Sequence, residues 1–186
     1  MKLLWTASLS LVLAGVAGSG EQAKFHLASA DIVPNGTIDN KFVFKGFGCT
    51  GGNVSPALNW SGAPAGTQSF ALLVHDPDAP TGGAGWWHWV VYDIPATATG
   101  ISQGAGTADG AALPAGAKQG VTDFGSAGWG GPCPPPGDAR HHYHFTLHAL
   151  KVAQLDIPAG ATAALIGYMV NANSLGKAEF TGLYGR

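Results

Sequence analysis

HHYHFTLHALK, residues 141–151, is the stretch that decides the fold class. One set of alternating positions begins with a histidine and is otherwise aromatic or apolar: His141, Tyr143, Phe145, Leu147 and Ala149. The intervening set is polar: His142, His144, Thr146 and His148. A period of two is typical of a β-strand that buries one face and exposes the other. The stretch therefore predicts a strand, with His141 and the Tyr143 hydroxyl where a core face meets a loop.

Two further stretches predict buried strands. SFALLVH (69–75) is followed by Asp76-Pro77, and WWHWVVYDI (86–94) is followed by Pro95. Both are short, apolar and bounded by turn residues. Weaker patterns predict short strands at 25–30, 41–44 and 178–184, and a helix over 158–173 with its body at 161–169. The intervals 46–56, 96–120 and 125–137 are rich in glycine and proline and predict long loops. The fold class is all-β with a short C-terminal helix.

Each main strand brings an ionisable residue to the edge of an apolar face. Phe70, Leu72 and Val74 share a face with Asp76, while Trp86, His88, Val90 and Tyr92 share a face of the next strand. If the three strands are neighbours, Asp76, His88 and His141 converge. Imidazoles can donate hydrogen bonds to an anion, the Gly130-Gly131 backbone could offer N–H groups, and Trp86 would supply an apolar wall.

Each of these features also has a purely structural interpretation. Asp76-Pro77-Asp78-Ala79-Pro80 is compatible with a stiff turn, and His88 with a hydrogen-bonded core histidine. The alternating His142, His144 and His148 are compatible with a solvated strand face or with a metal site, of which the solvated face is the expectation.

The N-terminus has the order of a secretory signal peptide. Met1-Lys2 is followed by the apolar run 3–16 and by small residues up to Gly20. We expect cleavage between residues 17 and 23, which leaves 21–186 as a single domain that is exported to the periplasm or secreted. The alternative is a buried N-terminal helix. No later segment is long and apolar enough to span a bilayer.

Composition narrows the class of partner. The chain has a net charge of −2 with neutral histidines, and removal of Lys2 would make it more negative. A mildly acidic protein is a poor candidate for binding nucleic acid or anionic membranes. The two cysteines, Cys49 and Cys133, would most simply form one disulfide in an exported chain, with two unpaired thiols as the alternative.

Taken together, the motifs resemble the phosphatidylethanolamine-binding protein family. DPDAP (76–80), WWHWVVYDIP (86–95) and GGPCPPPGDARHHYHFTLHAL (130–150) are similar to it in order and spacing, and the stretches 46–74 and 181–186 look like its bacterial Raf-kinase-inhibitor-like branch. The resemblance implies a two-sheet antiparallel β-sandwich. It also implies a pocket for phosphate-like or carboxylate groups formed by Asp76, Trp86, His88, Gly131, His141 and Tyr143. His142 stands where the family usually has arginine.

Three functions are compatible with these features. The leading hypothesis is an exported protein that binds a small anion or phospholipid head group, without a cofactor or metal. The alternative is an interaction protein that inhibits an extracellular or host kinase or protease pathway. The third is an enzyme using Asp76, His88 and His141 for acid–base chemistry or as metal ligands, although no serine or cysteine nucleophile stands in a recognisable motif.

Overall fold

The computed structural model describes residues 24–186, so the predicted signal peptide and its cleavage region lie outside the described residues. In chain order the strands are β1 (His26–Ala28), β2 (Lys45–Gly46), β3 (Cys49–Thr50), β4 (Leu58–Ser61), β5 (Ser69–Asp76), β6 (Trp86–Pro95), β7 (Gly100–Ile101), β8 (Lys118–Gln119), β9 (His141–Leu150) and β10 (Ser174–Tyr184). The helix α1 (Ala163–Asn173) precedes β10.

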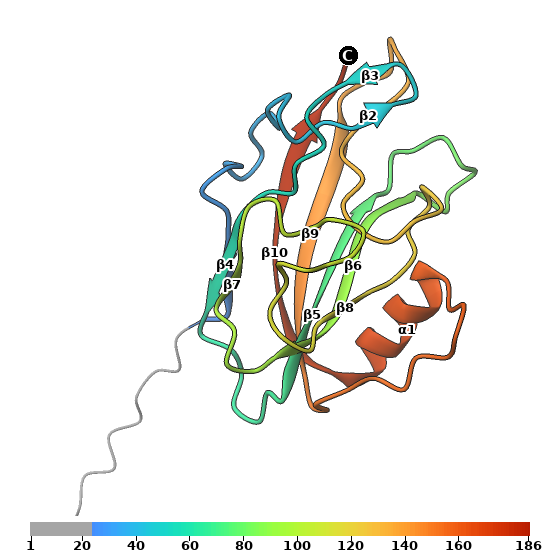
Figure 1. Cartoon of the computed structure of the whole chain (residues 1–186). Helices are drawn as coiled ribbons and strands as arrows, with labels where there is room; N and C mark the ends of the chain where they lie inside the picture. Colours follow the sequence, from blue (N-terminus) through green and yellow to red (C-terminus); the bar gives the residue numbers. More distant parts are fainter. Residues whose placement is uncertain (1–23) are drawn as a thin grey trace, which may run out of the picture.

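The main sheet has the strand order β10-β9-β5-β6-β8, and every neighbouring pair is antiparallel (Figure 1). The three strands predicted as the core, β5, β6 and β9, therefore lie next to one another at its centre. Val74 of β5 pairs with Trp89 of β6 on one side and with Phe145 of β9 on the other. This adjacency is what the convergence of Asp76, His88 and His141 requires.

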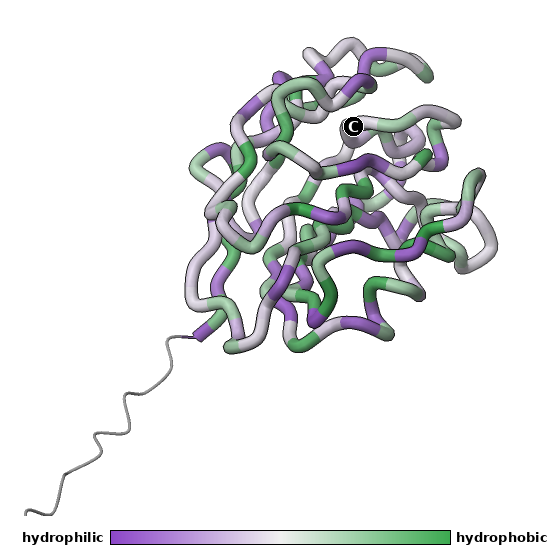
Figure 2. Tube along the Cα trace, turned by 60° about the horizontal axis from the view of Figure 1, so that its bottom comes forward, coloured by the Kyte–Doolittle hydropathy of each residue, from purple (hydrophilic) through white to green (hydrophobic). Residues whose placement is uncertain are grey.

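A smaller sheet, β1-β4-β7, packs across one face of the main sheet, and the two together enclose the larger core. Leu58 and Trp60 of β4 are buried there with Phe70, Leu72 and Phe145 of the main sheet. The prediction of a two-sheet antiparallel sandwich is confirmed. Figure 2 shows apolar and polar residues changing in short steps along much of the chain, whereas the central strand β5 is buried on both faces.

The helix α1 covers part of the opposite face of the main sheet (Figure 1). Ile166 and Val170 pack with Leu73 and Val90 in a second, smaller core. The helix begins at Ala163, five residues later than predicted, because the Thr162 side chain accepts a hydrogen bond from the Leu165 amide and caps it. Within residues 24–186 no helix is long and apolar enough to cross a membrane.

Several short elements differ from the predictions. Residues 41–44 form a turn, and strand pairing begins only at Lys45, so the predicted strand there is wrong. The strand β4 was not predicted. The strand β3 lies inside the interval 46–56, and β7 and β8 lie inside the interval 96–120, both of which were predicted as loops. The closing strand β10 begins at Ser174, four residues before the predicted start. These strands are short or continue directly from a helix, so local patterns are weak there.

The side chains of β6 do not simply alternate between the two faces of the sheet. Trp89 and Val91 point into the larger core, whereas Val90 and Tyr92 pack towards α1. The reason is a register shift between the pairs Val74–Trp89 and His75–Trp87, which places an extra β6 residue opposite β5. The prediction that Val90 and Tyr92 share the face of His88 is therefore wrong.

Candidate functional site

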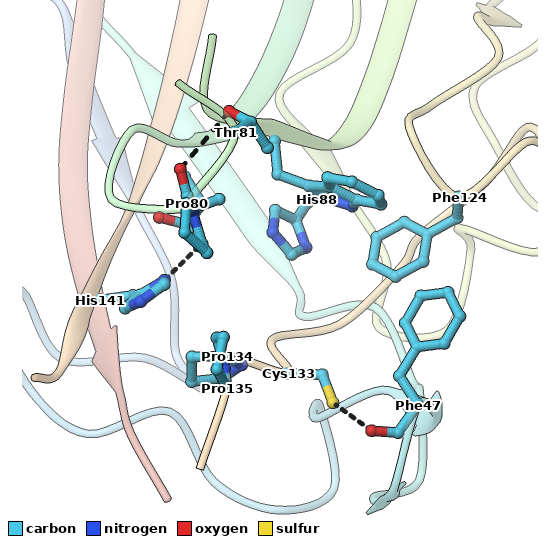
Figure 3. Close-up of a pocket in the computed structure, with 12 residues that line it drawn as sticks. Phe47, Pro80, Thr81, His88, Phe124, Cys133, Pro134, Pro135 and His141 are labelled. Carbon is cyan, nitrogen blue, oxygen red and sulfur yellow. Dashed lines mark hydrogen bonds and ion pairs between the residues drawn. The ribbon is translucent and has the colours of Figure 1, made fainter. Parts of the chain in front are cut away.

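A cavity of about 290 Å³ opens where β5, β6 and β9 meet the long loops. Its lining residues come from six separate segments: Phe47, Asp76, Ala79, Pro80, Thr81, Trp86, His88, Phe124, Cys133, Pro134, Pro135 and His141. The cavity lies beside the strand ends, where the sequence placed the site. Figure 3 shows His141 and Pro80 on one side, Phe124 and Phe47 on the other, and His88 between them.

Asp76 and His141 form a buried pair on one side of the cavity. His141 Nδ1 lies 2.8 Å from Asp76 Oδ2, and both side chains are almost fully buried. The other carboxylate oxygen of Asp76 accepts a hydrogen bond from the Asp78 amide at 2.9 Å. His141 Nε2 lies 3.5 Å from Asp138, which is partly exposed. Two carboxylates thus flank this imidazole, Asp76 at Nδ1 and Asp138 at Nε2.

His88 lies between β9 and the 124–130 loop. Its Nδ1 is 2.6 Å from the Gly130 carbonyl oxygen. Because a carbonyl only accepts, Nδ1 carries the proton, and in the neutral ring Nε2 is an acceptor. That Nε2 is buried and has no hydrogen-bond partner among the described residues. Burial lowers the pKa of His88 to about 4, although the bond to Gly130 and the charge of Asp76 oppose this shift. The ring is therefore neutral at pH 7.

Two other polar atoms near the cavity are buried without a hydrogen-bond partner in the described part of the chain, Trp86 Nε1 and the Tyr143 hydroxyl. Trp86 lines the cavity, whereas Tyr143 does not and lies behind His88, with the two rings edge to face at 5.1 Å. Burial raises the pKa of Tyr143, and the charge of Asp76 raises it further, so the phenol keeps its proton. Both groups are donors.

Gly131 supports the site without lining the cavity. Its amide donates to Asn53 Oδ1 at 2.8 Å, and the Gly130 amide donates to the His88 carbonyl at 2.9 Å. Both N–H groups suggested as ligand contacts are thus engaged within the protein. Glycine is required at 131 because a Cβ there would lie 2.1 Å from the Phe42 carbonyl oxygen. At Gly131 this loop passes directly against the backbone of residues 42–44.

The outer histidines do not form one group. His142 and His144 are exposed, whereas His148 is buried with its Nδ1 3.2 Å from Ser174 Oγ, so the prediction that His148 is exposed is wrong. The His142 ring pairs with Asp78 at 2.7 Å, on the face opposite His141. Within residues 24–186, no three or more His, Cys, Asp or Glu side chains are grouped to hold a metal ion.

The sequence did not indicate the aromatic side of the cavity. Phe47 lies in the interval 46–56 that was predicted as loop, and Phe124 lies just before the predicted loop 125–137. Nothing local showed that both reach the same cavity. The predicted Cys49–Cys133 disulfide is present, and it joins these two loop regions with a Cα–Cα distance of 6.0 Å. Cys133 itself lines the cavity, so the bond belongs to the wall of the site.

Comparisons with known proteins agree with this architecture. The family model described as phosphatidylethanolamine-binding protein matches residues 28–185. UPF0098 protein YbcL of Escherichia coli is 51% identical over 179 residues, which are 96% of this chain and 97% of that protein. Its crystal structure superposes with a TM-score of 0.85 over 88% of this chain and 99% of that one. A putative lipoprotein, LppC of Mycobacterium tuberculosis, is 44% identical over 139 residues, or 74% of this chain and 63% of that protein.

Proposed function

Since this chain belongs to the phosphatidylethanolamine-binding protein family, we propose that its cavity binds a small phosphate-like or carboxylate group and takes up protons as it does so. The observation that carries this proposal is the buried Nε2 atom of His88, which has no hydrogen-bond partner among the described residues. An unpaired buried polar group costs about 1–3 kcal/mol of stability. A bound ligand would remove this penalty.

The charges at the site explain why protons must accompany an anion. Within the described residues the cavity lining contains two histidines and Asp76 but neither lysine nor arginine. Among the lining side chains, only an imidazole can offer positive charge to an anion. The Arg186 guanidinium is not part of the lining and is bonded to the carbonyl oxygens of Phe47, Gly48 and Pro134. Trp86 Nε1 supplies a neutral donor. Because His88 has a pKa of about 4 in the free protein, an anion that requires this proton binds more tightly as pH falls, by up to about tenfold per pH unit.

Titration calorimetry with inorganic phosphate and with phosphoethanolamine, each at pH 7.5 and pH 5.5, tests the proposal. The unmutated protein should bind both, more tightly at pH 5.5. The substitutions His88→Ala and His141→Ala should weaken binding at least about tenfold, the worth of one charge-assisted hydrogen bond. The matched control is His142→Ala, which removes the neighbouring imidazole from the opposite face and should leave affinity unchanged.

Absence of phosphate and phosphoethanolamine binding by the unmutated protein at both pH values would refute the proposal. Equal losses for His141→Ala and His142→Ala would show that the inner face of β9 does not carry the site.

We also propose that the protein acts outside the cytoplasm. Three observations support this: the N-terminal pattern of charge and hydropathy, the Cys49–Cys133 bond, and a relative named as a putative lipoprotein. Disulfides persist in oxidising compartments and are rare in the cytosol. Fractionation of the native host, followed by mass determination of the N-terminus, should find the protein outside the cytoplasm and cleaved between residues 17 and 23. An uncleaved cytoplasmic protein would contradict this proposal.

A further inference from the structure

Phe47 stands in a position that is unfavourable for phenylalanine on two counts. It is the first residue of the two-residue turn between β2 and β3, and both Phe47 (φ 51) and Gly48 (φ 80) have positive φ angles. Such turns favour asparagine or glycine at the first position, because a Cβ is strained there. The residue is also 69% exposed, in a chain that buries most of its other phenylalanines. Neither local conformation nor core packing accounts for this side chain.

The turn is nevertheless firmly held at the mouth of the cavity. Cys49, two residues later, is bonded to Cys133. The Arg186 guanidinium donates hydrogen bonds to the carbonyl oxygens of Phe47 and Gly48 at 3.2 and 3.1 Å, and its Nε donates to Pro134 at 2.7 Å. These contacts fix the turn to the neighbouring 133–135 loop, which also lines the cavity. The exposed ring is thus presented at a defined place.

Phe47 belongs to a set of aromatic rings that we call the aromatic rim: Phe44, Phe47, Trp86 and Phe124. Phe47 is nearly parallel to Phe124, with ring centroids 6.0 Å apart, and Phe124 meets Trp86 edge to face at 5.5 Å. The Phe124 ring also lies 5.4 Å from the His88 ring. The rim therefore runs from the unpaired imidazole nitrogen outward to the exposed ring, opposite His141 (Figure 3).

We infer that the ligand carries an aromatic ring attached to its anionic group, and that Phe47 selects for it by stacking. This inference rests on the proposed function, because it assumes that the anionic group lies between His88 and His141. An exposed ring on a held turn at the cavity mouth offers a face to a planar group. Aromatic pairs gain more free energy than their buried area alone provides. The class that fits is an aryl phosphate or aryl carboxylate.

The size of the cavity agrees with such a ligand. At about 290 Å³ it lies at the lower end of the range for small-molecule pockets, roughly 300–1,000 Å³. That volume suits a single ring with a polar group better than a complete lipid. An aliphatic chain could fill the same space, but it would gain no stacking from Phe47 and Phe124.

The test compares three probes, inorganic phosphate, phenyl phosphate and n-butyl phosphate, by titration calorimetry at pH 5.5. The full chain as exported should bind phenyl phosphate about 3- to 10-fold more tightly than inorganic phosphate or n-butyl phosphate, the range expected for one or two aromatic contacts. In Phe47→Asn this preference should disappear while affinity for inorganic phosphate is retained. Asparagine suits the positive φ angle, so the turn still forms. Phe47→Tyr keeps the ring and should keep the preference.

A matched control is Val33→Asn, which changes an exposed apolar residue outside the cavity and should alter no affinity. Phenyl and n-butyl phosphate binding equally well, or a preference that survives in Phe47→Asn, would overturn the inference and leave the proposed function intact. Equal loss of all three probes in Phe47→Asn would assign the ring a structural role and overturn it as well. If the unmutated protein bound no probe, the proposed function would fail and the inference with it.

Discussion

Acid should destabilise this protein through two histidines that the fold keeps neutral. Burial lowers the pKa of His88 to about 4 and that of His148 to about 4, in each case from an ordinary value of 6.5. His88 is beside the cavity, whereas His148 lies on the opposite face of the sheet next to Ser174. Between pH 6.5 and 4 the unfolded chain binds protons at these positions that the folded protein does not. Stability is therefore full above pH 6.5 and falls as pH falls.

The size of the effect follows from the two pKa values. A difference of one pKa unit corresponds to about 1.4 kcal/mol, so each imidazole should lower the free energy of unfolding by roughly 2–3 kcal/mol between pH 7 and pH 4.5. Together they remove roughly 5 kcal/mol, comparable with the whole stability of a marginal domain. Asp78 does not interfere: burial raises its pKa, the bonds from His142 outweigh this, and its net pKa lies below 3.8, outside the pH window.

Urea unfolding at half-unit steps from pH 7 to pH 4.5 measures this loss of free energy of unfolding. The unmutated protein is compared with the variants His148→Gln and His88→Gln. Each variant should lose roughly 2–3 kcal/mol less than the unmutated protein over the same range, whatever its stability at pH 7. Adding phosphate at pH 5 should restore the part of the free energy of unfolding that is lost through His88, because phosphate binds the protonated ring. It should not restore the part that is lost through His148. If the free energy of unfolding fell with pH by the same amount in all three proteins, the reasoning would be refuted.

Two further perturbations test the walls of the site. Replacing both Cys49 and Cys133 by serine opens a loop with a sequence separation of 84 residues, which should lower the free energy of unfolding by about 4–5 kcal/mol in the chain-entropy model; an unchanged urea midpoint would contradict this. Gly131→Ala should lower it by about 3 kcal/mol or more, because the new Cβ would lie 2.1 Å from the Phe42 carbonyl oxygen; a variant as stable as the unmutated protein would show that this loop can move.

The polar half of the site could be predicted from the sequence because it lies on regular strands. Alternation along β9 places His141 on the inner face and His142 on the outer one, and alternation along β5 places Asp76 beside it. Adjacency of β5, β6 and β9 was the remaining assumption, and the structure confirms it. Period-two patterns are informative wherever a strand is long and one face is covered.

The prediction of which face a side chain lies on failed where that face depends on how the strand pairs with its neighbour. In β6 a register shift near His88 turns both Val90 and Tyr92 towards α1, and no local pattern distinguishes WWHWVV with this shift from the same letters without it. The burial of His148 also depends on tertiary structure, since Ser174, at the start of β10, lies against its ring. The aromatic rim was missed because Phe47 and Phe124 meet only through the disulfide and the tertiary fold.

His88 and Phe47 are two residues of the cavity lining that depart from the rules that the fold otherwise follows. His88 is a buried imidazole with an unpaired nitrogen, and Phe47 is an exposed ring in a strained turn. Either departure lowers stability without improving packing. Natural proteins that break one or two such rules usually do so at functional sites. That the two departures lie on the same cavity, joined by Phe124, is the reason for assigning them to one ligand with a polar and an aromatic part.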